Sequence, residues 1–159
     1  MKKLILITFL LIVSIGASSE VFAQRKAVSG AEVTGAFRSY FKGKYKGNYN
    51  EILIQALGGN KLKIEMGLTY PFQVNGELSA NVGEASGEAL INGDTAVFVP
   101  DSSTENNKAC KITLRFSQPG TLIVTTENNT NCGFGLNVSA DGTYKKTSSA
   151  KPKFGANQE

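Results

Sequence analysis

The chain has 159 residues, a formal net charge of +4, no histidine and two cysteines. This length suits one domain with a single hydrophobic core. Without histidine the chain lacks the usual general base near neutral pH, the Ser-His-Asp triad and the commonest metal ligand. The positive charge is mild and spread out, which gives no indication of a nucleic-acid partner. We therefore predict no enzyme activity, no cofactor and no metal site.

Residues 1–23 have the pattern of a secretory signal peptide. Lys2 and Lys3 precede an apolar run over residues 4–15, which is too short to cross a bilayer as a helix. Ala23 ends a small-x-small-like cleavage site, and removal of two lysines and one glutamate from the 17 basic and 13 acidic residues leaves a mature chain of net charge +3. The alternative is an uncleaved N-terminal anchor. We expect a periplasmic or secreted protein with no transmembrane segment after cleavage.

The two cysteines, Cys110 and Cys132, are most simply explained as a disulfide, because exported proteins meet an oxidising compartment. Closing this loop would stabilise the fold by roughly 3 kcal/mol through the unfolded state. The alternative is a reactive or metal-binding pair. That pair has no histidine to join it and the wrong spacing for zinc.

Residues 24–31 look like a linker, and residues 32–38 fit either a helix or a strand. A capping box that begins at Ser29 favours the helix. We favour the strand, because its Thr-Gly-Ala-Phe-Arg resembles residues 141–145, and the first and last strands of a closed barrel must pair. Over residues 29–41 the helix stays open as the alternative.

Four strands are expected between residues 51 and 99, with turns that contain glycine between them. In the second of these strands every other residue is apolar, which places Leu62, Ile64, Met66 and Leu68 on one face. Gly83 and Gly87 interrupt the third and predict bulges or bends. The predicted strands are 51–57, 61–69, 77–91 and 95–99, with turns at 58–60 and 92–94, a loop at 70–76 and a polar loop at 100–108.

The last three strands begin at Cys110. Residues 110–116 alternate between apolar and polar side chains, and a Pro-Gly turn at 118–120 leads into a return strand over residues 122–126. A loop at 128–140 precedes the last strand, 141–146. We therefore place the domain at residues 32–146 and expect residues 147–159 to form a flexible tail.

Eight strands that follow one another directly predict an all-β, antiparallel up-and-down barrel of the calycin-like kind, which leaves no free sheet edge. Alternating strand direction places the three tight turns at one end of the barrel. The long loops at 39–50, 70–76, 100–108 and 128–140 fall at the other end. Both cysteines also fall at this long-loop end, so the predicted disulfide agrees with the topology.

The best candidate for a binding site is the long-loop end, where aromatic side chains lie among lysines and can stack on sugars or bind anionic groups. The alternative is that two or three of these rings close the barrel mouth as part of the core. Glu84 and Glu88 share a strand face and could form a carboxylate pair, although solvated outward charges explain them more simply. The candidate binding residues are Tyr40, Phe41, Tyr45, Tyr49, Tyr70, Phe72 and Phe134.

Residues 84–154 contain the pattern GEA-INGDTAVF-P, then CKITLRF-PGTL-VT, then CGFG-NV-ADGTYKK-SSAKPKF. This pattern resembles a group of small, exported, uncharacterised bacterial β-proteins, and the resemblance implies export. The chain is more loosely similar to periplasmic lysozyme inhibitors, which are small β-barrels with a disulfide. No inhibitory loop of that family can be matched here residue by residue. The positive charge also argues against docking onto a cationic lysozyme.

We expect an exported, non-enzymatic barrel that binds an envelope protein, a glycan or another extracellular partner through its long-loop end. Many large inward residues predict an interior filled by side chains, so binding should occur on the surface. The alternatives are a lysozyme-inhibitor-like protein and a structural component of the envelope. We take the protein as a monomer by default.

Overall fold

The computed structural model describes residues 27–101, 103 and 109–155. Over these residues the chain forms a closed antiparallel barrel in which eight strands pair in chain order and β8 returns to β1. The predicted eight-stranded up-and-down barrel is therefore confirmed. The strands are β1 (Gly35–Tyr40), β2 (Tyr49–Gly58), β3 (Lys61–Val74), β4 (Glu77–Asn92), β5 (Thr95–Phe98), β6 (Lys111–Gln118), β7 (Thr121–Glu127) and β8 (Gly142–Ser148).

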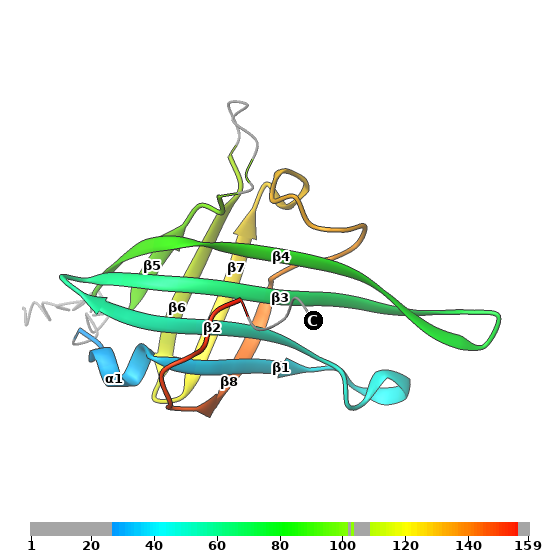
Figure 1. The fold of residues 1–159 in the computed structure, drawn as a ribbon, viewed down its shortest axis with the longest axis horizontal. Coiled ribbons are helices and arrows are strands. Elements are labelled where there is room, and N and C mark those ends of the chain that lie inside the picture. The colour runs from blue at the N-terminus through cyan, green and yellow to red at the C-terminus, as the bar shows by residue number, and fades with distance from the viewer. Residues whose placement is uncertain (1–26, 102, 104–108, 156–159) are drawn as a thin grey trace, which may run out of the picture.

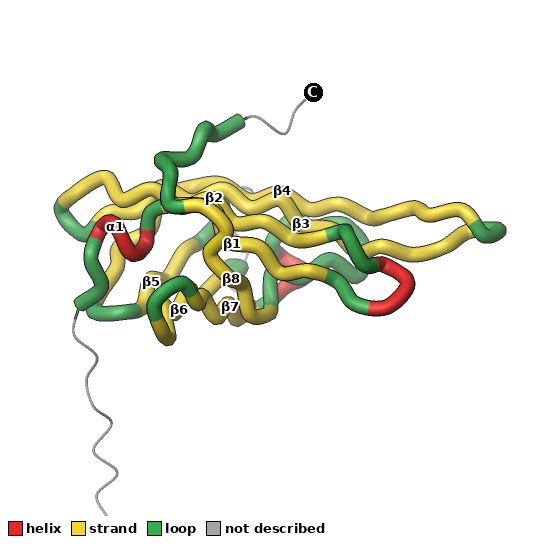
Figure 2. Tube along the Cα trace, turned by 90° about the horizontal axis from the view of Figure 1, so that it is seen from below, coloured by secondary structure: helices red, strands yellow, loops and turns green. Residues whose placement is uncertain are grey.

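Strands β1–β4 run across the molecule in one layer, and β5–β8 cross steeply behind them (Figure 1). The hairpin of β3 and β4 is much longer than the others and projects beyond the barrel as a two-stranded arm (Figure 2). Its register is continuous from Lys61↔Leu90 at the barrel to Val74↔Glu77 at the tip. The arm lies at the end of the barrel opposite the helix α1 (Gly30–Val33).

The barrel interior is filled by side chains from every strand. Alternate residues of a strand point to opposite faces, so the apolar positions in the sequence converge on one core. The inward faces that the alternating patterns of β3 and β6 predict are confirmed. The largest fully buried side chains are Tyr144, Phe37, Phe98, Phe116, Ile52, Ile54, Leu62, Ile64, Met66, Leu68, Ile112 and Leu114.

The predicted loop at residues 70–76 is wrong. β3 continues to Val74, and the chain reverses in a tight turn in which Asn75 and Gly76 have φ of 50° and 86°. An Asn-Gly pair is the preferred sequence for this type I′ hairpin turn. Pro71 lies beyond Gly67, the last β3 residue to pair with β2, so β3 is an edge strand on that side, where proline is tolerated.

At Gly83 and Gly87, where we expected bulges or bends, β4 has no bulge against β3, because the register passes both residues without a shift. Both glycines instead permit close packing. A Cβ at Gly83 would lie 3.0 Å from the Phe134 ring, and one at Gly87 would lie 2.9 Å from Phe98. Register shifts occur elsewhere, including between Ala36 and Phe37 where β1 meets β8.

The ambiguous segment at residues 29–41 contains both a helix and a strand. Ser29 caps α1 by accepting a hydrogen bond from the Glu32 N–H at 3.2 Å, and β1 begins at Gly35. The preference for a strand throughout was therefore only partly right. The expected linker is also shorter, because Val28 packs on the core and donates its N–H to the Gly93 carbonyl. The predicted signal peptide lies outside the described residues.

The disulfide between Cys110 and Cys132 is present and joins the start of β6 to the loop after β7. This loop contains a short 3₁₀ helix, η2 (Asn129–Asn131), and the β1–β2 connection contains another, η1 (Gly43–Tyr45). Most of the predicted polar loop, residues 102 and 104–108, lies outside the described residues.

The predicted tail does not begin at residue 147, because β8 continues to Ser148. The described part of the tail then crosses the outer face of β2 and β3 (Figure 1). The Gly155 N–H donates to the Glu65 carboxylate, and the Lys63 ammonium lies 4.5 Å from the Phe154 ring centroid. These contacts hold residues 149–155 against the sheet. Residues 156–159 lie outside the described part.

Closure of the barrel depends on a close approach at Gly35. Its φ is 144°, and a Cβ there would overlap the backbone carbonyl of Ser148 on β8. We therefore expect Gly35→Ala to lower the free energy of unfolding by about 2 kcal/mol more than Gly43→Ala, measured in urea. Gly43 is a matched control because its φ is also positive, 62°, and nothing lies within 4 Å of the added Cβ. Equal losses in the two variants would contradict this account of closure.

Tyr144 links the last strand to the core. Its side chain is fully buried, its hydroxyl donates to the Ala140 carbonyl at 2.9 Å, and burial raises its pKa above the ordinary value. A raised pKa in the folded state means that the neutral phenol stabilises the fold below about pH 10 and that this contribution is lost as pH rises through the folded-state pKa. The stability advantage over Tyr144→Phe, measured by urea unfolding, should therefore shrink above about pH 10. An advantage that does not change with pH would contradict this.

Candidate functional site

Two of the predicted aromatic residues form a pair on the outer face of the barrel. Tyr40 ends β1 and Tyr49 begins β2, and the two residues are register partners. Their ring centroids are 5.6 Å apart at an interplanar angle of 59°. Tyr40 is 53% exposed and Tyr49 is 37% exposed. Large exposed rings at the long-loop end can contact a partner without any rearrangement of the core.

Arg38 fixes this ring pair. Its guanidinium carbon lies 4.1 Å from the Tyr49 ring centroid, and its Nε donates to Glu51 Oε1 at 2.6 Å. Glu51 is the register partner of Arg38 on the neighbouring strand, so the sheet itself brings the two charges together. The hydrogen bond to Glu51 raises the pKa of Arg38. Tyr49 therefore packs against an arginine whose position is fixed, and whose positive charge is stabilised, by Glu51.

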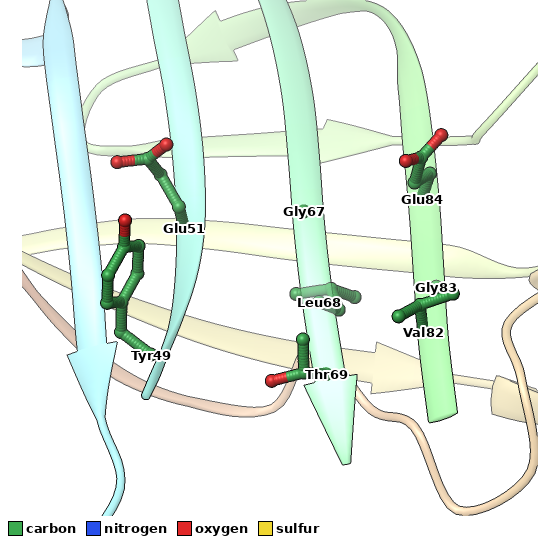
Figure 3. A pocket seen from close by; sticks show the side chains of 8 residues that line it. All are labelled: Tyr49, Glu51, Gly67, Leu68, Thr69, Val82, Gly83 and Glu84. Carbon is green, nitrogen blue, oxygen red and sulfur yellow. The ribbon is translucent and has the colours of Figure 1, made fainter. Parts of the chain in front are cut away.

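The outer face has a depression beside this pair, here called the Gly67 hollow. The register runs from Glu51 on β2 to Gly67 on β3 and on to Glu84 on β4, so two carboxylates flank a position that has no side chain. Figure 3 shows the two glutamates on either side of β3. The hollow has a volume of about 250 Å³ and is lined by Tyr49, Glu51, Gly67, Leu68, Thr69, Val82, Gly83 and Glu84.

The two carboxylates of the hollow differ in their partners. Glu51 is neutralised by Arg38, whereas Glu84 makes no hydrogen bond or ion pair with any described residue. Glu88, which we paired with Glu84 from the sequence, lies on the same outer face and is 3.8 Å from the Lys61 ammonium. The nearest counterpart of Glu84 across the hollow is thus Glu51. Counted over the residues that the structure describes, the hollow therefore carries excess negative charge.

The other candidate residues lie in separate places. Tyr45 belongs to η1, and Phe41 precedes it. Tyr70 and Phe72 lie on the arm, which the η1 loop reaches through a 3.5 Å contact between Lys44 Nζ and Gln73 Oε1.

Phe134 is half-buried and packs against the inner face of β4 at Gly83, so this ring belongs to the core that closes the barrel mouth. The alternative that some rings form core therefore applies to Phe134. The Tyr40–Tyr49 pair lies on the outer surface instead.

A second depression of about 510 Å³ lies on the outer face under the C-terminal segment and includes Glu65, Glu88 and Asp101. Among the described residues no three acidic or cysteine side chains are grouped as metal ligands. No helix in this part of the chain has the length and apolar character to cross a membrane.

No family model, curated protein or solved structure matches the chain. The resemblances to small exported β-proteins and to lysozyme inhibitors therefore stay predictions.

The Arg38–Glu51 pair should be energetically coupled, because its side chains are only 32% and 15% exposed and its hydrogen bond is short. In a double-mutant cycle with Arg38→Met and Glu51→Gln we expect a coupling of about 1 kcal/mol, measured by urea unfolding. The pair Lys61–Glu88 is the control, because both side chains are 58% exposed and 3.8 Å apart. Its coupling should be about 0.2 kcal/mol. A larger coupling in the control pair would contradict this description of the site.

Proposed function

We propose that this is an exported, non-enzymatic binding protein that recognises a partner in the cell envelope or outside the cell. The partner binds the outer surface at the long-loop end. The Tyr40–Tyr49 pair supports this proposal most directly. Both rings are large, partly exposed and adjacent, and Arg38 holds one of them in place. Pre-positioned aromatic side chains lose little conformational entropy on binding, which is why they dominate many interfaces.

The packing of the barrel explains why the Tyr40–Tyr49 pair lies on the outer face. Apolar side chains fill the interior, so the inward faces of the strands are committed to packing. The tight-turn end is occupied by α1, with Val33 fully buried there. The outer face beside the long loops is left as the surface with exposed rings, a hollow and a projecting arm. Export is proposed from the signal-peptide pattern, and a disulfide suits an oxidising compartment.

The experiment is a capture from the envelope of the producing cell with immobilised mature protein, analysed for both protein and glycan. Wild-type protein should retain a saturable partner, and Tyr40→Ala/Tyr49→Ala should retain at least about tenfold less of it. The control is Leu57→Ala, which truncates a side chain that is 44% exposed near the tight-turn end of β2. It should behave like the wild type.

Capture that is unchanged in the double tyrosine variant would contradict binding at this surface. Loss of capture in Leu57→Ala alone would place the partner at the opposite end. Failure of the wild-type protein to retain any partner would overturn the proposed function, and a structural role in the envelope would then be favoured.

A further inference from the structure

Gly67 is the one residue of the Glu51–Gly67–Glu84 row without a side chain, and its backbone conformation does not require a glycine. Its φ is not positive, in contrast to Gly35, Gly58 and Gly76. A glycine in a strand weakens it relative to β-branched residues, because it loses more backbone entropy and packs no side chain. Glycine within a strand often marks a place where a ligand approaches the backbone closely. The position is on the outer face, so core packing does not require it either.

From this geometry we infer that the Gly67 hollow binds a sugar ring of a saccharide that carries no acid group. This inference rests on the proposed function and names the class of ligand at the same surface. The bare backbone of Gly67 forms the floor. Glu51 on β2 and Glu84 on β4 stand on either side of it, and Tyr49 and Val82 line the end of the hollow beside Thr69.

Each wall of the hollow suits one property of a sugar ring. Ionised carboxylates are acceptors only, with two oxygens each, and hydroxyl groups are donors that they bind strongly. Glu51 Oε1 already accepts from Arg38, so the carboxylate is held in place while its other oxygen can accept from a ligand. Aromatic rings such as Tyr49 bind the apolar C–H face of a sugar and present their own polar edge to water.

The charge of the hollow decides which sugars are admitted. Glu84 has no hydrogen-bond or ion-pair partner among the described residues, so none of them compensates its charge. An acidic saccharide would place like charges side by side, which is repulsive. A neutral sugar avoids this repulsion, and an amino group would gain an ion pair with Glu84. A wholly apolar ligand would leave both carboxylates desolvated and unpaired, which is costly.

The test uses mature protein on a glycan array that holds neutral, amino-bearing and acidic saccharides. Wild-type protein should bind members of the first two classes. Gly67→Val should reduce this binding by about tenfold or more, because it fills the floor of the hollow with a residue that strands favour. Thr113→Val is the control, since it places a valine on the partly exposed face of another strand, β6, away from the hollow. It should bind like the wild type.

A second variant, Glu84→Gln, keeps the shape of the side chain and removes its charge. It should weaken binding of amino-bearing saccharides more than binding of neutral ones. Thermal unfolding of all variants shows that each is folded before binding is compared.

Preferential binding of acidic saccharides, equal binding by Gly67→Val and wild type, or no retained saccharide would each overturn the inference. The envelope capture separates this failure from that of the proposed function. If capture still depends on Tyr40 and Tyr49 while no saccharide binds, the protein is a binding module whose partner is not a sugar. If capture also fails, both proposals fall.

Discussion

The pairing of β8 with β1 is the constraint on which the rest of the structure depends. It turns a meander of strands into a closed barrel and removes both sheet edges. The pairing requires the absence of a side chain at Gly35, where β1 passes the Ser148 carbonyl. Strand β8 also holds the helix α1 at the tight-turn end. The Lys146 ammonium donates to the carbonyls of Ala31 and Glu32 at 2.9 Å each, and burial lowers the pKa of Lys146.

Closure of the barrel determines which of its surfaces are left for binding a partner. Because every strand contributes inward side chains to one packed core, the interior is used for stability. The outer faces and the two ends then remain. α1 covers one end, and the other end has the disulfide, the arm and the short 3₁₀ segments. The Tyr40–Tyr49 pair lies on β1 and β2 at this side, and the Gly67 hollow lies next to it over β2, β3 and β4.

Period-two alternation made most of the barrel predictable from the sequence. In β6 the side chains of Ile112, Leu114 and Phe116 are both regularly spaced and buried, so pattern and packing agree. The disulfide could be predicted as well, because strand direction alone brings Cys110 and Cys132 to the same end. The arm was missed, although the alternation of β3 continues through Tyr70, Phe72 and Val74 and the Asn75–Gly76 turn was a usable signal.

The candidate site was less predictable, for a physical reason. The aromatic residues of the long-loop end were found by composition, but composition does not separate Tyr49, which is partly exposed, from Phe134, which packs on Gly83. The Gly67 hollow was missed altogether. It arises from residues of three strands, and only the register shows that Glu51 and Glu84 are opposite the same glycine. A shift of one residue would move every side chain to the other face.

The central claim is that this barrel binds through its outer face and not through its interior. The most direct measurement is an amide NMR titration of the folded protein with soluble glycans released from the envelope of the producing cell. We expect shifts centred on Tyr49, Gly67 and Glu84, with core amides such as Ile64 and Leu114 unchanged. Shifts concentrated in the core amides would place the ligand inside the barrel and contradict the account.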